Sequence, residues 1–328
     1  MRRAAASYML RSRRVASRTL TAPAMRHYAS ASASGSAAGD ASGSADTTSS
    51  NGRTTHFGYQ TVPEEEKERL VGHVFESVAS QYDLMNDVMS AGVHRLWKDT
   101  MVGMIGASAL GAERLQVLDV AGGTGDIAFR IADDVAAAAA AAGRSPSGPA
   151  TATDAGLDDD EAARIVVCDI NPHMLAEGRR RAEQLPPVLH RPRLEFVTAD
   201  ARKLPFDDCS FDVYTIAFGI RNVTVIEEAL AEARRVLRPG GRFLCLEFSH
   251  VTNPLLAAVY EQYSFKVIPA MGELVANDRA SYQYLVESIR KFPKQEVFSQ
   301  MMRDAGLRAV THTNLTFGTV AIHSGFRF

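Results

Sequence analysis

Cysteine is scarce in this chain of 328 residues, and its spacing excludes two common uses of thiols. Cys168, Cys209 and Cys245 are the only three. They provide neither a disulfide framework nor a repeated metal-ligand spacing, and no cluster of His, Cys and carboxylate residues in the sequence suggests a metal site. Cys168 and Cys245 fall inside apolar strand patterns, where buried thiols pack as small hydrophobic groups. The sequence therefore favours a reducing compartment and predicts no metal.

Long apolar runs and early acidic residues are also missing. No stretch approaches the roughly 20 apolar residues of a membrane-spanning helix, so we expect no transmembrane segment. The first acidic residue is Asp40, whereas residues 1–28 contain seven arginines. A segment rich in Arg, Ala and Ser without acids is typical of a mitochondrial transit peptide, and Arg26-His27-Tyr28 favours cleavage after Tyr28. The alternative is a disordered basic tail.

The rest of the chain is acidic and suits one large domain. Without residues 1–28, 29 basic side chains face 38 acidic ones, a net charge of −9. This charge argues against nonspecific binding to nucleic acid, which depends on neutralising phosphates. Residues 29–60 are mostly small and polar, so we expect a disordered linker there. Residues 61–328 suit a single α/β domain, with a low-complexity, alanine-rich insert over 134–163.

A glycine-rich turn organises that domain. The apolar run 115–120 contains Asp119, and the sequence Gly-Gly-Thr-Gly at 122–125 follows before a helical pattern of apolar residues. Because glycine has no Cβ, a strand, tight turn and helix of this kind lets backbone N–H groups approach a ligand closely. Ligands of open α/β sheets bind at the carboxyl ends of the strands. We therefore expect this turn to form the floor of the site.

Two ligands compete for the turn, a dinucleotide and a nucleoside. Gly123, Gly125 and Ala128 match the dinucleotide fingerprint, which is weak without further context. S-adenosylmethionine (SAM) uses a similar turn, and a nearby carboxylate stabilises its α-ammonium and sulfonium charges. Asp119 and Asp126 would repel a pyrophosphate, so the charges of the turn favour SAM. The remaining alternative is a turn that only packs the helix on the strand.

Acidic residues follow the next two predicted strands. The buried pattern at 164–169 ends at Asp169, which is placed to accept hydrogen bonds from both ribose hydroxyls of SAM or of a dinucleotide. The strand predicted at 194–197 is followed by Asp200 and Ala201. We expect the Asp200 carboxylate to accept from an adenine amino group and the Ala201 N–H to donate to the same ring.

The remaining pattern completes an open α/β sheet. Apolar runs predict further strands over 213–218, 243–248, 307–315 and 317–327, the last two forming an antiparallel finish. Asn171 precedes a proline and is predicted to cap a helix. Thr224 with Glu227 predicts a capping box for the helix that follows the fourth strand.

Two aromatic stretches lie outside the strand and helix alternation. Residues 82–97 mix the single Trp with Tyr, Met and polar residues, and they predict a helix pair that is either a structural cover or a lid over the site. Residues 254–271 are rich in aromatic and apolar side chains. They predict core packing, the wall of an apolar substrate tunnel, or a partner surface.

Several motifs together resemble the ubiquinone/menaquinone biosynthesis C-methyltransferases. The segments 82–97 and 235–249 look like the two signature motifs of that family, and the glycine turn, residues 218–223 and residues 275–278 fit the same pattern. The resemblance covers the chain from about residue 70 to its end. Two departures are the alanine-rich insert, absent from compact bacterial relatives, and Ala217, where some of those relatives carry Ser.

The resemblance implies a class I, Rossmann-like SAM-dependent methyltransferase: an α/β fold with a mostly parallel seven-stranded sheet, an antiparallel last strand and an N-terminal helical cover. It implies methylation of a ring carbon of a polyprenylated benzoquinol in ubiquinone (coenzyme Q) biosynthesis, in the mitochondrial matrix. It also implies a homodimer that associates with other coenzyme Q proteins and lies peripherally on the matrix face of the inner membrane. The predicted cofactor-binding residues are Asp119, Gly122, Gly123, Thr124, Gly125, Asp169, Asp200 and Ala201.

Methylation at carbon requires an electron-rich ring, which loss of a phenolic proton provides. Arg221 follows the fourth strand, and we expect it to stabilise the developing phenolate because its guanidinium stays charged and donates in a fixed fork. A water held by Arg221 and Asn222, or a nearby carboxylate, is the predicted proton acceptor. His94 and His250 are other candidate bases, although a lone histidine is more often structural. The structural alternative for Arg221 is an ion pair with an acid.

Two other functions remain open from the sequence. The first is a SAM-binding scaffold that holds a quinone-biosynthesis complex together with little turnover of its own. The second is a nicotinamide oxidoreductase, because the glycine turn and Asp169 suit both SAM and NAD. Binding measurements with SAM and with NADH separate the two enzymatic alternatives.

Overall fold

The computed structural model describes residues 53–78, 86–87, 89–112, 114–142, 162–186, 189, 192–276 and 278–328. The predicted transit peptide (1–28) and most of the predicted linker lie outside these residues. So does the larger part of the alanine-rich insert, residues 143–161, while its beginning continues helix α6 (Asp126–Ala141). Every described residue belongs to one compact unit, which spans Asn51–Phe328.

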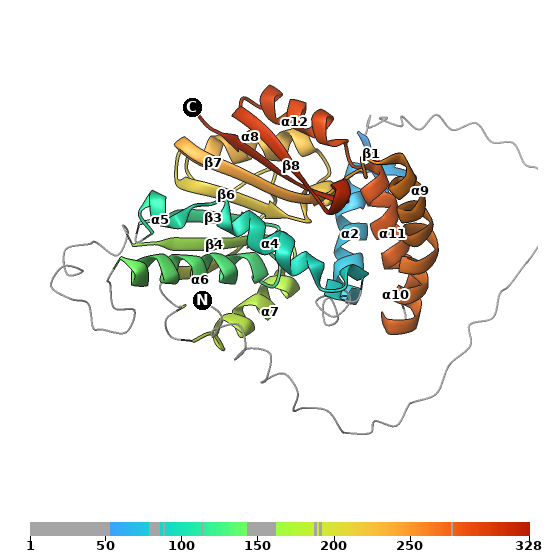
Figure 1. The fold of residues 1–328 in the computed structure, drawn as a ribbon, viewed down its shortest axis with the longest axis horizontal. Helices are drawn as coiled ribbons and strands as arrows, with labels where there is room; N and C mark the ends of the chain where they lie inside the picture. Colours follow the sequence, from blue (N-terminus) through green and yellow to red (C-terminus); the bar gives the residue numbers. More distant parts are fainter. Residues whose placement is uncertain are drawn as a thin grey trace, which may run out of the picture. The chain divides into compact units, whose positions relative to one another are not determined.

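Seven strands form the central sheet in the order β5-β4-β3-β6-β7-β9-β8 (Figure 1). They are β3 (Gln116–Val120), β4 (Arg164–Asp169), β5 (Arg193–Thr198), β6 (Phe211–Ala217), β7 (Leu237–Phe248), β8 (Arg308–Leu315) and β9 (Val320–Phe326). The first five run parallel, whereas β9 is antiparallel to both β7 and β8. The predicted fold class is confirmed, including the antiparallel last strand.

Helices cover both faces of this sheet, which explains why the central strands read as continuous apolar runs. All five residues of β3 are buried. Val117 packs on one face with α4 (Val93–Gly103) and α6, and Leu118 packs on the other with α8 (Ile226–Val236) and α12 (Gln295–Asp304). Cys168 and Cys245 are buried free thiols in these clusters, as predicted.

A second group of elements covers the carboxyl ends of the parallel strands (Figure 1). It consists of a hairpin of β1 (Thr54–Phe57) and β2 (Gln60–Pro63), helix α2 (Glu64–Val78), α9 (Pro254–Gln262), the π-helical turn η4 (Tyr263–Val267), α10 (Ile268–Ala276) and α11 (Arg279–Lys291). The linker predicted for 29–60 overlaps this hairpin at its end. Lys67 of α2 is 1% exposed and donates to the Val223 carbonyl at 3.1 Å, which attaches α2 to the loop after β6.

The helix caps only partly follow the prediction. Asn171 caps α7 (Pro172–Ala182) and accepts from the His173 and Met174 N–H groups, as expected. The predicted capping box of Thr224 and Glu227 is wrong. Helix α8 begins one residue later, its N-cap is Val225, and no side chain caps it. The Thr224 carbonyl instead accepts from the Thr55 hydroxyl, so a tertiary contact fixes this turn.

The Gly219→Ala substitution should destabilise the sheet at the ends of β3 and β6. An added Cβ at Gly219 would overlap the Cβ of Ala121, in the turn after the neighbouring strand. Such overpacking costs about 1–3 kcal/mol, so we expect the midpoint of thermal unfolding to fall by several degrees. The control is Gly103→Ala in α4, where an added Cβ meets nothing within 4 Å. This control should be neutral or slightly stabilising, and equal midpoints for both variants would contradict the prediction.

Candidate functional site

The first cavity lies at the carboxyl ends of β3, β4 and β6. These strands flank the point where the strand order reverses, which is where open α/β sheets bind ligands. Its lining includes every predicted cofactor residue except Gly125, namely Asp119, Gly122, Gly123, Thr124, Asp169, Asp200 and Ala201. Gly125 stands at the start of α6 with φ +84° and ends the turn.

Glycine is required in the turn for two separate reasons. Gly123 has φ +53° and Gly125 has φ +84°, in the left-handed region that side chains disfavour. At Gly122, an added Cβ would lie 2.7 Å from Val167 Cγ1 and 2.8 Å from Asp119 Oδ2. The turn therefore packs closely against β3 and β4, and its other side faces the cavity.

Asp169 holds the turn and borders the cavity. Its Oδ2 accepts from the Gly123 N–H at 2.9 Å, and its Oδ1 accepts from the Asn171 N–H at 2.8 Å. Burial raises the pKa of this carboxyl, although the backbone hydrogen bonds oppose that rise. Each carboxylate oxygen can accept a second hydrogen bond. Asp169 can therefore position the glycine turn and bind a diol simultaneously.

Asp119 is a wholly buried carboxyl beneath the same turn. The Thr215 hydroxyl donates to its Oδ1 at 2.7 Å, and its Oδ2 has no hydrogen-bond partner among the described residues. Burial raises its pKa to about 7. An unpartnered buried oxygen is costly, and a cationic ligand in the cavity would relieve that cost.

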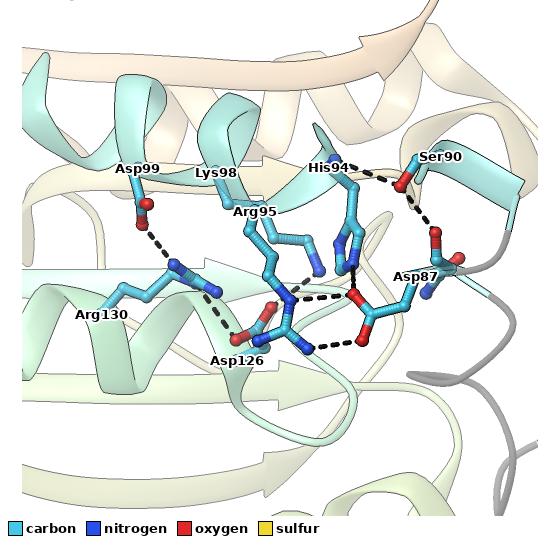
Figure 2. Close-up of polar contacts among 9 residues, drawn as sticks. Asp87, Ser90, His94, Arg95, Lys98, Asp99, Asp126 and Arg130 are labelled. Carbon is cyan, nitrogen blue, oxygen red and sulfur yellow. Dashed lines mark hydrogen bonds and ion pairs between the residues drawn. The ribbon is translucent and has the colours of Figure 1, made fainter. Parts of the chain in front are cut away.

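The charges of Asp126 and Asp200 are already paired in the structure. Lys98 Nζ lies 2.7 Å from Asp126 Oδ2, and Arg130 Nε lies 3.1 Å from its Oδ1 (Figure 2). The repulsion of a pyrophosphate therefore depends on Asp119 more than on Asp126. The Arg202 guanidinium donates to Asp200 Oδ2 from Nε at 2.9 Å and from Nη2 at 2.6 Å, and Nε also lies 3.2 Å from Oδ1. The adenine contact of Asp200 stays a prediction.

A second, more aromatic cavity adjoins the first. Phe75, Lys98 and Phe218 line both cavities. The further lining of the second includes Trp97, Phe248, Tyr260, Tyr263, Ile268, Tyr282 and Tyr284. Three of these belong to the aromatic stretch 254–271, which therefore lines a cavity as well as packing against its neighbours. The two cavities together can hold a nucleoside beside an apolar ring.

Arg221 borders the second cavity and is also ion-paired. It lies on the 3₁₀ turn η3 (Ile220–Asn222), and its Nη1 is 2.9 Å from Glu247 Oε1 at the end of the neighbouring strand β7. The Glu247 side chain is 1% exposed; burial raises its pKa, and Arg221 opposes that rise. Among the described residues, nothing accepts a hydrogen bond from Arg221 Nη2. The guanidinium thus has an acid partner and a free donor.

The other predicted catalytic groups occupy different places. Asn222 borders the first cavity, and its Oδ1 accepts from the Tyr284 hydroxyl at 2.9 Å. His250 Nε2 lies 2.9 Å from the Phe292 carbonyl oxygen and lines neither cavity. His94 borders the second cavity, and its Nε2 lies 2.8 Å from Asp87 Oδ1. Arg221 and Asn222, although adjacent, thus face different cavities.

Sequence reasoning missed Lys98, which lines both cavities. It also missed Asp87 and Glu247, which pair with the lining residues His94 and Arg221. Glu247 lies inside the apolar strand pattern 243–248, and an acid inside such a pattern is a signal for a buried charge with a partner. Within the described part of the chain, no group of three His, Cys, Asp or Glu side chains could hold a metal ion. No described helix is long and apolar enough to cross a bilayer.

Comparisons with known proteins identify the family. Residues 61–327 match the ubiE/COQ5 methyltransferase family. The mitochondrial 2-methoxy-6-polyprenyl-1,4-benzoquinol methylase of Danio rerio is 55% identical and covers 85% of this chain and 86% of its own length. The protein of the same name from Homo sapiens is 52% identical over 83% of this chain and 84% of its own length. The one from Oryza sativa is 53% identical over 84% of this chain and 90% of its own length. This chain therefore belongs to the ubiE/COQ5 family of SAM-dependent methyltransferases, as its sequence motifs predicted.

Proposed function

We propose that this chain transfers the methyl group of SAM to a ring carbon of 2-methoxy-6-polyprenyl-1,4-benzoquinol in ubiquinone biosynthesis. The single observation that carries the proposal is the pair of adjoining cavities, one lined by the glycine turn and acids and the other by aromatic residues. Phe75, Lys98 and Phe218 are common to both linings. A sulfonium methyl in the first cavity can therefore face a ring in the second.

The cofactor-binding roles follow the chemistry of each residue. Asp169 would accept from the ribose hydroxyls, and the backbone of Gly122 to Gly125 would approach the nucleoside closely. Asp119 would stabilise the positive charges of SAM with its unpartnered Oδ2. Asp200 and Ala201 would bind the adenine edge. No metal takes part in this proposal.

The acceptor ring must become nucleophilic before the methyl group moves. Loss of a phenolic proton places negative charge on the ring carbons ortho and para to that oxygen. One such carbon then displaces the methyl group from the sulfonium in line. The charges of phenolate and sulfonium cancel, so a dry cavity favours the transfer, and alignment contributes much of the rate. Arg221, which borders the second cavity, would stabilise the phenolate oxygen.

SAM affinity should rise as the pH increases through about 7. Burial raises the pKa of Asp119 to about 7 in the folded protein, against about 3.9 in an unfolded chain. The empty protein therefore loses stability as the pH rises from about 4 to 7, and cationic SAM binds better once this carboxyl is ionised. Titration calorimetry in buffers of different ionisation enthalpy should detect proton release on binding below pH 7.

The Asp119→Asn variant should bind SAM more weakly at pH 8 and release no proton at pH 6.5. The control is Asp134→Asn. Burial also raises the pKa of Asp134, but this residue does not line the first cavity. Unaltered proton release by the Asp119 variant would show that a different group titrates.

The proposed setting is the mitochondrial matrix, on the matrix face of the inner membrane, as a homodimer associated with other coenzyme Q proteins. The relatives named above are mitochondrial. Exposed apolar side chains on α9 and α10 support a contact with a membrane or protein: Leu255 is 81% exposed, Val259 69% and Leu274 86%. The benzoquinol substrate carries a polyprenyl tail, which also favours a site near a membrane.

The test of this function is direct. Purified protein is incubated with isotopically labelled SAM and a short-tailed demethylated quinol, and mass spectrometry locates the label. A labelled methyl group on the ring carbon supports the proposal. Label on oxygen, or no transfer despite SAM binding, would reject it in favour of another acceptor or of a scaffold with little turnover.

A further inference from the structure

A histidine on the wall of the aromatic cavity has no part in the mechanism so far. His94 lies in the first turn of α4, is 6% exposed, and lines the second cavity together with Phe218 and Arg221. The proposed reaction needs a proton acceptor in this cavity, and Arg221 cannot be one because its guanidinium stays protonated.

Asp87 fixes the orientation of this histidine (Figure 2). Its Oδ1 lies 2.8 Å from His94 Nε2, and Arg95 holds the same carboxylate at 2.8 and 2.6 Å. Arg95 and His94 lower the pKa of Asp87 to about 2, so the carboxylate is ionised and only accepts hydrogen bonds. A neutral His94 therefore carries its proton on Nε2 and presents Nδ1 as a free lone pair.

The second ring nitrogen is buried and unused. His94 Nδ1 has no hydrogen-bond partner in the described part of the chain, and an orphaned buried acceptor needs a physical explanation. His323 also has an unpartnered Nδ1, but its Nε2 faces the Gln295 backbone carbonyl, and it lines neither cavity. Only His94 combines a carboxylate partner, a free nitrogen and a place in a cavity wall among the described histidines.

We propose that His94, positioned by Asp87, is the general base that removes the phenolic proton of the substrate. This inference rests on the proposed function. Nδ1 takes the O–H proton as the ring carbon forms its bond to the methyl group, and the S–CH₃ bond breaks with its electron pair going to sulfur. The resulting dienone loses the hydrogen of the methylated carbon while the imidazolium returns a proton to oxygen. One proton is released overall, and the products are a neutral quinol and a neutral thioether.

The charges around His94 suit this role. Lys98, one turn further along α4, is paired with Asp126 of α6, and Arg221, which also lines the second cavity, is paired with Glu247. Burial lowers the pKa of His94 below its usual 6.5, while the hydrogen bond that His94 donates to Asp87 opposes this. The imidazole is therefore neutral at physiological pH and available as a base. Protonation below pH 6.5 would abolish that availability.

The first test compares His94→Ala and His94→Gln with the unaltered full-length protein. Both variants should bind SAM within about threefold of normal affinity and lose about 100-fold in kcat. The acidic limb of the wild-type pH–rate profile, below pH 6.5, should disappear. Added imidazole should restore part of the activity of His94→Ala, and a more acidic fluorinated quinol should shrink the loss in both variants. A structural role for His94 would produce neither effect.

Asp87→Asn tests the positioning residue. Without the carboxylate, the pKa of His94 falls further, so we expect the acidic limb to move to lower pH and kcat to fall about tenfold. His250→Ala is the matched control, because this histidine contacts a backbone carbonyl and lines neither cavity. Its pH profile should match that of the wild type, and thermal unfolding should show that every variant is folded.

The outcomes separate this inference from the proposed function. If the unaltered protein methylates no quinol ring, the proposed function fails. If it does so and the folded His94 variants keep their acidic limb, or lose activity without rescue by imidazole and without relief by the acidic quinol, the general-base role is overturned. Loss of the acidic limb with imidazole rescue supports it.

Discussion

Replacing Arg221 with alanine should lower kcat about 10³-fold and leave SAM affinity within about threefold. Removing one preorganised donor to a developing oxyanion typically costs a factor of 10²–10³, and Arg221 is also the cation paired with Glu247 among the described residues. The side chain lines the second cavity but not the first. Steady-state assays measure kcat, and titrations with SAM on the same protein preparation measure the affinity.

The buried partner of Arg221 requires a control. Arg221→Ala leaves Glu247 unpaired in a site where it is 1% exposed, and such a residue destabilises the fold by about 3–5 kcal/mol. The double variant Arg221→Met with Glu247→Gln removes both charges and should recover most of the stability, but not the activity. Equal losses of SAM binding and turnover in Arg221→Ala would reject a role specific to the transition state.

Replacing Asp169 with alanine should raise the dissociation constant for SAM about 10³-fold. Hydrogen bonds to a charged group contribute about 1.5–3 kcal/mol each, so losing both ribose contacts weakens binding by about 3–6 kcal/mol. The substitution also removes the acceptor of the Gly123 N–H at 2.9 Å, which loosens the glycine turn. Isothermal titration with SAM, and with the product S-adenosylhomocysteine, measures the loss.

The control for this variant is Asp133→Ala, an exposed acid on α6 that does not line the cavity. It should leave the dissociation constant unchanged. At saturating SAM, Asp169→Ala should regain a large share of its turnover, because Asp169 does not border the aromatic cavity. If SAM affinity were unchanged, the ribose assignment would be wrong.

Most of the sheet could be predicted because strands that are buried on both faces appear in the sequence as continuous runs of apolar residues. Strand β4 has the predicted bounds, 164–169, and the acids Asp119 of β3 and Asp169 of β4 lie at the cavity. Helix α11 was not predicted. Its N-terminus depends on Asp278, which accepts from the Ser281 N–H at 3.0 Å, and its buried face includes Tyr282 and Val286. Propensity alone does not show which apolar residues such a helix buries.

The ion pairs of the cavities could not be predicted, because they depend on spatial neighbours. Arg221 follows β6 and Glu247 is the last residue but one of β7, and the parallel pairing of those two strands brings them together. Asp87 and His94 are seven residues apart, a spacing that suits one helical face, but a carboxylate so placed has many possible partners. The sequence analysis treated Asp126 as an unpaired negative charge, whereas in the structure Lys98 pairs with it and compensates that charge.

Helix α2 covers part of the first cavity. Its Glu68, Val71, Gly72 and Phe75 line the first cavity, so α2 would cover part of a bound nucleoside. Lys67 of α2 donates a hydrogen bond to the Val223 carbonyl. Glu68 forms an ion pair with Arg202, which also pairs with Asp200. If the thioether product leaves past α2, these contacts must loosen first, and product release instead of methyl transfer would then limit turnover. Asp200, the acid expected to bind adenine, is thus also connected to helix α2 through Arg202 and Glu68.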